Sequence, residues 1–155
     1  MKGVIKLNNK GLTLIELLIG MALLSLVMAA VFTFLVMNIN FSNTAQDEIY
    51  IQEQVRNAMK VITDLAMDQE KYSIVSSSHI KLQVGATETA FKYEDGAVKY
   101  ISGSNTKVIA SNIKEFKVEN IIEDKLFKVT IKGIKHEGTK KEVGFELTNQ
   151  IFLRN

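Results

Sequence analysis

The chain opens with a long apolar run. Residues 17–37 contain no charged side chain, and the uncharged stretch continues to residue 46. As an α-helix that rises ~1.5 Å per residue, residues 17–37 span roughly 30 Å, which is about the thickness of the hydrocarbon core of a bilayer. The pattern therefore predicts a helix that is apolar on every side over this stretch.

The apolar run passes into an amphipathic segment without a helix breaker, because the chain contains no proline. The apolar stripe comprises Ile51, Val55, Met59, Ile62 and Leu65 or Ala66, and the polar face comprises Glu48, Gln52, Arg56, Lys60 and Asp64. Spacings of three and four residues are typical of one helical face. We expect a single helix that ends near residues 68–71, with a bend allowed by the modest helix formers at 38–43.

From Tyr72 onward the apolar period shortens to two, which predicts strands. We expect about seven short strands in one antiparallel meander, at residues 79–84, 91–94, 97–100, 107–110, 113–119, 126–132 and 143–153. Asp95 and Gly96 form the expected two-residue turn of a hairpin. The serines at 76–78 and the polar segments at 102–105, 123–125 and 136–142 are expected to be turns or loops.

The two patterns together predict an α+β fold. One apolar face of an antiparallel sheet needs a cover, and the amphipathic stripe of the helix can supply it. We expect an N-terminal segment at 1–11, an apolar helix at 12–37, its amphipathic continuation at 38–70, and an antiparallel β head at 71–155.

Charge and cysteine content exclude several classes of function. The net charge is +2, and the first eleven residues carry three lysines, so the remainder has a net charge of −1 and no basic surface for nucleic acid is implied. The absence of cysteine excludes disulfides, thiolate metal sites and cysteine catalysis. The basic start predicts that the N-terminus stays in the cytoplasm and that the chain beyond the apolar run lies outside.

One carboxylate, Glu16, stands at the start of the apolar run, in the stretch KGLTLIE at residues 10–16. This stretch resembles the processing site of type IV prepilins and type II secretion pseudopilins. The resemblance implies that a membrane peptidase removes residues 1–11 as a leader by cleaving after Gly11, and then methylates the new amine of Leu12. It also implies that Glu16 pairs with the N-terminal amine of a neighbouring subunit, because a paired buried charge costs much less than an unpaired one.

Two other interpretations of the N-terminal segment remain open. A secretory signal peptide has an apolar core of ~7–15 residues followed by a small-residue cleavage site, whereas Ala29 and Ala30 lie inside this longer run. A plain membrane anchor explains the length and the basic flank but not Glu16, since a charge at the centre of a spanning helix costs ~2.5 kcal/mol or more. Near the edge of the membrane the cost is smaller, and Glu16 would then reach the headgroups.

The resemblance also implies a type of subunit. Major pilins generally carry a proline in the apolar helix and many carry a cysteine pair, and this chain has neither, which favours a minor pilin or pseudopilin. The later strands and the ending at residues 151–155 look like the larger minor pseudopilins of type II secretion. Leu12 departs from the usual phenylalanine.

The implied partners are other pilin subunits, the prepilin peptidase, the assembly platform and membrane lipid. The implied location is the cytoplasmic membrane, crossed once with the head outside, and then a pilus or pseudopilus. An adhesive or motility pilus, a secretion pseudopilus and a competence pilus all fit. The alternative from another class is a membrane-anchored extracytoplasmic binding module that never polymerises.

The sequence offers no clear catalytic or metal-binding motif. His79 and His136 are the only histidines, and neither has acidic or cysteine neighbours at the spacing of metal ligands. No glycine-rich phosphate loop or serine nucleophile motif occurs. We therefore expect no metal, no cofactor and no enzymatic activity. The lysines that alternate with apolar residues are expected on the solvated side of the sheet; they are Lys114, Lys117, Lys128 and Lys132.

Overall fold

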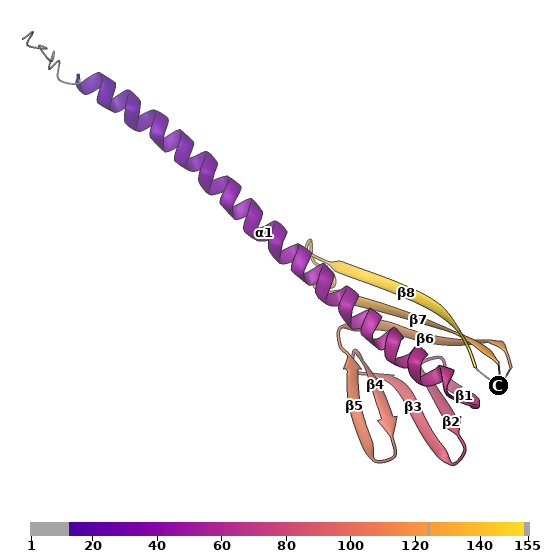
Figure 1. Cartoon of the computed structure of the whole chain (residues 1–155). Helices are drawn as coiled ribbons and strands as arrows, with labels where there is room; N and C mark the ends of the chain where they lie inside the picture. The colour runs from indigo at the N-terminus through magenta and orange to yellow at the C-terminus, as the bar shows by residue number, and fades with distance from the viewer. Residues whose placement is uncertain (1–12, 124, 154–155) are drawn as a thin grey trace, which may run out of the picture. The chain divides into compact units, whose positions relative to one another are not determined.

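The computed structural model describes residues 13–123 and 125–153. Within these residues the chain forms one helix, α1 (Leu14–Met67), and eight strands (Figure 1). The strands are β1 (Lys71–Ser76), β2 (His79–Val84), β3 (Thr87–Glu94), β4 (Ala97–Ser102), β5 (Asn105–Ala110), β6 (Ile113–Ile122), β7 (Leu126–Lys135) and β8 (Val143–Phe152). The chain divides into two compact units, Met1–Ser42 and Asn43–Asn155, and we refer to the second unit as the head.

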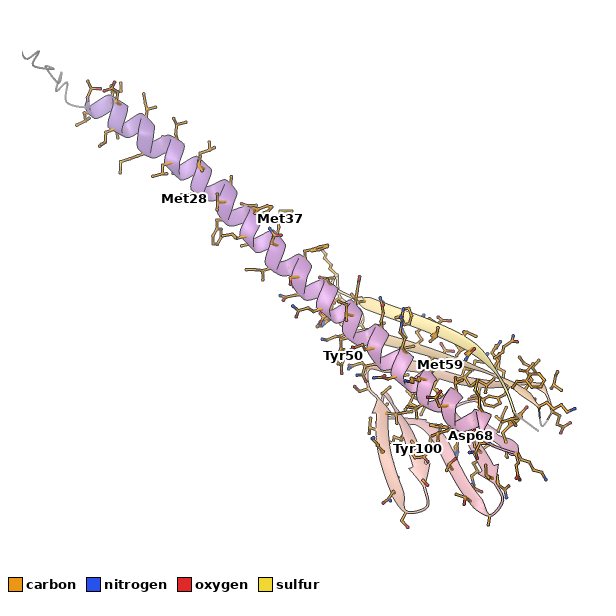
Figure 2. All side chains as sticks on the ribbon, in the orientation of Figure 1. Met28, Met37, Tyr50, Met59, Asp68 and Tyr100 are labelled. Atoms are coloured by element: carbon orange, nitrogen blue, oxygen red, sulfur yellow. The ribbon has the colours of Figure 1, made fainter. Side chains whose placement is uncertain are left out.

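In the first unit, α1 is apolar on every side, as the sequence predicts. Every large aliphatic, methionine or phenylalanine side chain from Leu14 to Phe41 is at least 41% exposed. Figure 2 shows the side chains of Met28 and Met37 standing out from the helix. The helix runs without interruption through Gly20 and through the modest helix formers at 38–43.

In the head, the strands form two antiparallel sheets rather than the single meander of seven strands that we expected. Five strands pair in the order β1-β2-β3-β4-β5, and three pair in the order β6-β7-β8. The separation occurs after β5, where Asn112 adopts the left-handed conformation with φ of 56°. The chain then leaves β5, and the N–H of Ile113 donates to the carbonyl of Gly96, in the turn between β3 and β4, at 2.9 Å.

The strand missing from the sequence prediction is β1. Only Tyr72 is buried in this strand and only Ile74 is half-buried, so its apolar signal is weak. The strand exists because it pairs with β2 over most of its length, with an irregularity after Ile74. Tertiary pairing therefore supplies what the local pattern lacks.

The C-terminal part of α1 covers both sheets of the head (Figure 1). Its buried residues are Ile51, Val55, Ala58, Met59, Ile62 and Ala66, which confirms the predicted stripe, adds Ala58 and selects Ala66 over the half-buried Leu65. The sheets contribute fully buried side chains that include Ile80, Leu82, Phe91, Phe127, Val129, Ile131 and Ile151. The observed architecture is thus an α+β fold in which a long N-terminal helix packs against antiparallel sheets.

The predicted solvated face of the three-stranded sheet is also present. Glu119 lies between two of the predicted lysines and accepts a bond from Lys117 at 2.6 Å and another from Lys128. The hydrogen bonds from these two ammonium groups hold the pKa of the Glu119 carboxyl at about 2. Because such exposed pairs contribute little to stability, this face chiefly keeps the sheet soluble.

Tyr72 joins the two sheets through its hydroxyl. The hydroxyl lies 2.6 Å from Asn120 Oδ1, 2.9 Å from the carbonyl of Ile122 and 3.2 Å from the carbonyl of Leu126. Replacing Tyr72 with phenylalanine should lower the free energy of unfolding by about 1 kcal/mol, because acceptors in a partly buried site lose their donor. Urea unfolding of the full chain in detergent measures the change.

Tyr100 provides the matched control for that substitution. It is also half-buried in the head, but its hydroxyl has no hydrogen bond among residues 13–123 and 125–153. Tyr100→Phe should therefore leave the free energy of unfolding nearly unchanged. Equal losses for the two variants would refute a structural role for the Tyr72 hydroxyl.

Candidate functional site

The first turn of α1 is closed by reciprocal hydrogen bonds between Thr13 and Glu16. The backbone N–H of Thr13 donates to Glu16 Oε2 at 2.9 Å, and its hydroxyl donates to the same oxygen at 2.8 Å. In return, the N–H of Glu16 donates to Thr13 Oγ1 at 3.4 Å. This is a capping box, which satisfies backbone N–H groups that the first turn of a helix cannot satisfy by itself.

The capping box explains why the helix begins at this point in the chain. A threonine followed three residues later by a glutamate satisfies the first turn, and such a cap is worth ~1 kcal/mol. The carboxylate also lies at the positive end of the helix dipole, where a negative charge is favourable. Gly11 and Leu12, the predicted cleavage residues, lie outside the residues that the structure describes.

Both donors that reach the Glu16 carboxylate from the described residues use the same oxygen. Both of its accepted bonds end on Oε2, and Oε1 meets no donor among residues 13–123 and 125–153. An exposed oxygen of this kind can accept a hydrogen bond from an ammonium group, and such charge-assisted bonds are the strong ones. The geometry thus allows Glu16 to cap its own helix and to bind a cation at the same time.

The apolar surface behind Glu16 lacks a cover within its own unit. The exposed fractions of its large side chains run from 41% at Val36 to 79% at Leu14. Its few polar side chains bond back to the helix: Ser25 Oγ donates to the carbonyl of Ala22 at 2.8 Å, and Thr33 Oγ1 donates to that of Ala29 at 2.9 Å. Among the described residues, α1 alone is long and apolar enough to cross a membrane.

The two histidines are not parts of a metal site in the described part of the chain, where no group of three or more histidine, aspartate and glutamate side chains is placed to hold a metal ion. His79 lies in β2, and its Nε2 is buried without a hydrogen-bond partner. Burial lowers the pKa of His79, and the nearby charges of Lys81 and Lys92 lower it further. Both effects favour the neutral form of His79 in the sheet.

His136 does have a carboxylate partner, which sequence spacing did not reveal. Its Nε2 lies 2.9 Å from Asp47 Oδ2, and Lys135 Nζ lies 2.5 Å from Asp47 Oδ1. Lys135 Nζ also lies 5.1 Å from the centre of the Tyr50 ring, and Tyr50 is marked in Figure 2. We call Asp47, Lys135 and His136 the acidic clamp, since one carboxylate holds the end of β7 and the following turn to α1.

The acidic clamp makes stability depend on pH at the acid end. The hydrogen bond from Lys135 is the main cause that lowers the pKa of Asp47 in the folded chain. A group with a lowered folded pKa stabilises the fold above its unfolded pKa of about 3.9, and this contribution is lost as the pH falls through the folded pKa. We expect Asp47→Asn to reduce stability near neutral pH but not below the folded pKa.

Urea unfolding of the wild-type chain and of Asp47→Asn at a series of pH values checks this expectation. The two curves should converge as the pH is lowered. A constant difference between them at every pH would show that Asp47 acts through packing rather than through its charge.

Comparison with known proteins bears on the N-terminal part of the chain. Residues 6–32 match the family model of the prokaryotic N-terminal methylation motif. No curated protein and no solved structure gives a significant match. The matched stretch includes the Thr13–Glu16 capping box and the first part of the exposed apolar helix. This prepilin-type motif supports a type IV pilin-like protein that is processed by prepilin peptidase.

Proposed function

We propose that the chain is a minor type IV pilin or pseudopilin. In this proposal prepilin peptidase cleaves after Gly11, the amine of Leu12 is methylated, and the mature subunit enters a pilus or pseudopilus. The observation that carries the proposal is the exposed apolar helix that begins within the methylation motif and continues beyond it, with the Glu16 carboxylate at its start. The chain would act as a structural subunit and would catalyse no reaction.

The physical basis of assembly would be packing of apolar helices. Before assembly, lipid covers the exposed side chains from Leu14 to Phe41, with the head outside the cytoplasmic membrane. In the filament, neighbouring helices replace the lipid. The new amine at Leu12 and the Oε1 oxygen of Glu16 then neutralise each other between subunits, which avoids the cost of two unpaired buried charges.

Absence of proline and cysteine supports a minor subunit over a major one. The helix also lacks a break between Leu14 and Met67, whereas a proline inside a helix removes a hydrogen bond and kinks it. The neighbouring genes would identify the machine that uses the subunit. The candidates are an adhesive or motility pilus, a secretion pseudopilus and a competence pilus.

The intact mass of the protein, purified from membranes of a strain that contains the peptidase, tests the proposal. We expect a chain that begins at Leu12 and carries one added methyl group. A strain without the peptidase should yield the full-length chain and is the control. Retention of residues 1–11 in both strains would overturn the proposal.

The competing function is a membrane-anchored binding module that does not polymerise. One observation on the head favours this function, because α1 and the two sheets of a single chain share one core. Such a module would need the apolar helix for anchoring, and it would use the charge of Glu16 only at the start of its own helix, not for a contact between subunits. Substitution of Glu16 therefore separates the two functions.

A further inference from the structure

The turn between β7 and β8 lies against the part of α1 that follows the apolar run. Together they line a shallow hollow of about 350 Å³, which we call the junction hollow. Its lining residues are Asn43, Thr44, Gln46, Asp47, Lys135, His136 and Lys141. All of them belong to the head. The acidic clamp fixes the turn to the helix here, through the bonds of Asp47 to Lys135 and His136.

The junction hollow has the chemistry of an anion site. Two of its lining side chains, Lys135 and Lys141, are cations, and Asp47 is its one carboxylate. The side-chain amide of Asn43 on α1 can also donate hydrogen bonds. Lysine ammonium groups beside neutral donors are suited to phosphate oxygens.

The other acidic side chains of this turn are occupied elsewhere. Glu137 pairs with Lys114 on β6, with Nζ and Oε1 2.5 Å apart. Glu142 accepts the backbone N–H of Gly138 at 2.7 Å, within the turn itself. Neither carboxylate lines the junction hollow. An anion there would therefore meet two lysines and one carboxylate, that of Asp47, which is already bound to Lys135 and His136.

The position of the junction hollow along the chain selects the source of the anion. Phe41, the last large apolar side chain of the run, is 76% exposed, and Asp47 is the first charged residue after it. Both residues lie in α1, and an α-helix rises ~1.5 Å per residue, so six residues advance roughly 9 Å along it. If residues up to Phe41 lie in a bilayer, the junction hollow is held within reach of the headgroup region, which is roughly 5–8 Å deep on each side.

We propose that the junction hollow binds the phosphate of an anionic phospholipid headgroup and thereby docks the head on the outer surface of the membrane before assembly. This inference rests on the membrane-inserted state of the proposed function. Docking would hold the subunit in one orientation in the membrane. Entry into a filament would then require release of the headgroup.

The absence of cysteine makes a site-specific probe possible in the full chain. Lys140 is exposed and does not line the junction hollow. Lys140→Cys, labelled with a fluorophore, is reconstituted into vesicles of phosphatidylcholine alone or mixed with phosphatidylglycerol, each containing a quencher attached to the headgroup. We expect strong quenching only with phosphatidylglycerol, and weaker quenching as salt is added.

A pair of matched charge variants assigns the effect to the junction hollow. Adding Lys141→Gln should lower the ratio of docked to undocked chains about fivefold, the effect of one lysine near an anionic surface. Lys107→Gln removes the same charge from an exposed position on β5 and should leave the ratio unchanged. Equal quenching in both lipids, or equal effects of the two substitutions, would overturn the proposal.

Two further measurements distinguish failure of headgroup docking from failure of membrane insertion and from general phosphate binding. Inorganic phosphate at matched ionic strength should not release the label; release would indicate a general phosphate site and overturn the assignment to lipid. A second label at Ala30→Cys should be shielded from a water-soluble quencher. Exposure of that label would overturn membrane insertion, and headgroup docking with it, whereas a shielded Ala30 label with an unquenched Lys140 label would overturn docking alone.

Discussion

Glu16→Gln should abolish incorporation of the subunit into filaments while leaving its cleavage and its membrane insertion intact. Glutamine at this position of a capping box still reaches back to the Thr13 N–H, so the start of α1 is preserved. The substitution removes only the negative charge, and in the proposed filament it would leave the amine of Leu12 in a neighbouring subunit unpaired. Breaking a buried pair costs ~3–5 kcal/mol, which corresponds to a loss of roughly a hundredfold or more in incorporation.

Filaments sheared from cells and membranes from the same cells provide the measurement, with both fractions probed for the head. Glu16→Val is the companion variant, since it removes the charge and the capping oxygen Oε2 together. If the charge is the decisive property, both variants should be absent from filaments and present in membranes. Normal incorporation of Glu16→Gln would reduce Glu16 to a helix cap, whereas absence of the unsubstituted chain from filaments would favour the anchored binding module.

Local signals in the sequence were sufficient for several elements of the head. The Asp95-Gly96 pair predicts a two-residue hairpin turn, and both residues have positive φ, at 53° and 71°. The flanking strands β3 and β4 pair up to that turn, from Glu94 and Ala97 outward. The apolar stripe of α1 was equally clear, because a helix that covers a sheet must repeat its apolar positions every three or four residues.

The division into two sheets could not be predicted, because alternation reports one buried face and not which strands pair. β5 and β6 follow each other in the chain, yet they belong to different sheets. The deciding feature is the turn at Ser111 and Asn112, which is tied to α1: the N–H of Ser111 donates to Gln54 Oε1 at 2.9 Å. Asn112 is a local signal for a turn, because asparagine tolerates positive φ. That this turn separates two sheets depends on its contact with Gln54 of α1, which is 57 residues away from Ser111 in sequence.

The acidic clamp was hidden for the same reason. Asp47 appears in the sequence as an ordinary charge on a helix, and His136 as a histidine in a polar loop. Their contact spans 89 residues, so no spacing rule for ligands or catalytic groups applies to it. By contrast, the N-terminal motif is contained in a few neighbouring residues, so the sequence alone could single out Glu16. The capping box joins Thr13 and Glu16, which are only three residues apart in the same motif.

Gly133 of β7 should be the most sensitive small residue of the head. A Cβ atom at this position would lie 2.8 Å from Val55 Cγ2 and 2.9 Å from Ile51 Cγ2. Both methyl groups belong to β-branched side chains on a buried helical face, which have few alternative rotamers. Gly133→Ala should therefore force α1 away from the sheet and lower the free energy of unfolding by about 1–3 kcal/mol.

Gly144→Ala is the matched control, since Gly144 lies on β8 opposite Ile134, the residue next to Gly133. Its added Cβ would meet only the carbonyl oxygen of Gly133, at an ordinary contact distance of 3.5 Å. Urea unfolding of the full chain in detergent should thus separate the two variants, with Gly144→Ala neutral or slightly stabilising because alanine restricts the unfolded chain. Equal stability of the two variants would mean that α1 yields to the added methyl group. In that case the close contact between α1 and β7 would not be what fixes the helix on the sheet, and the acidic clamp would have to hold that end of the head by itself.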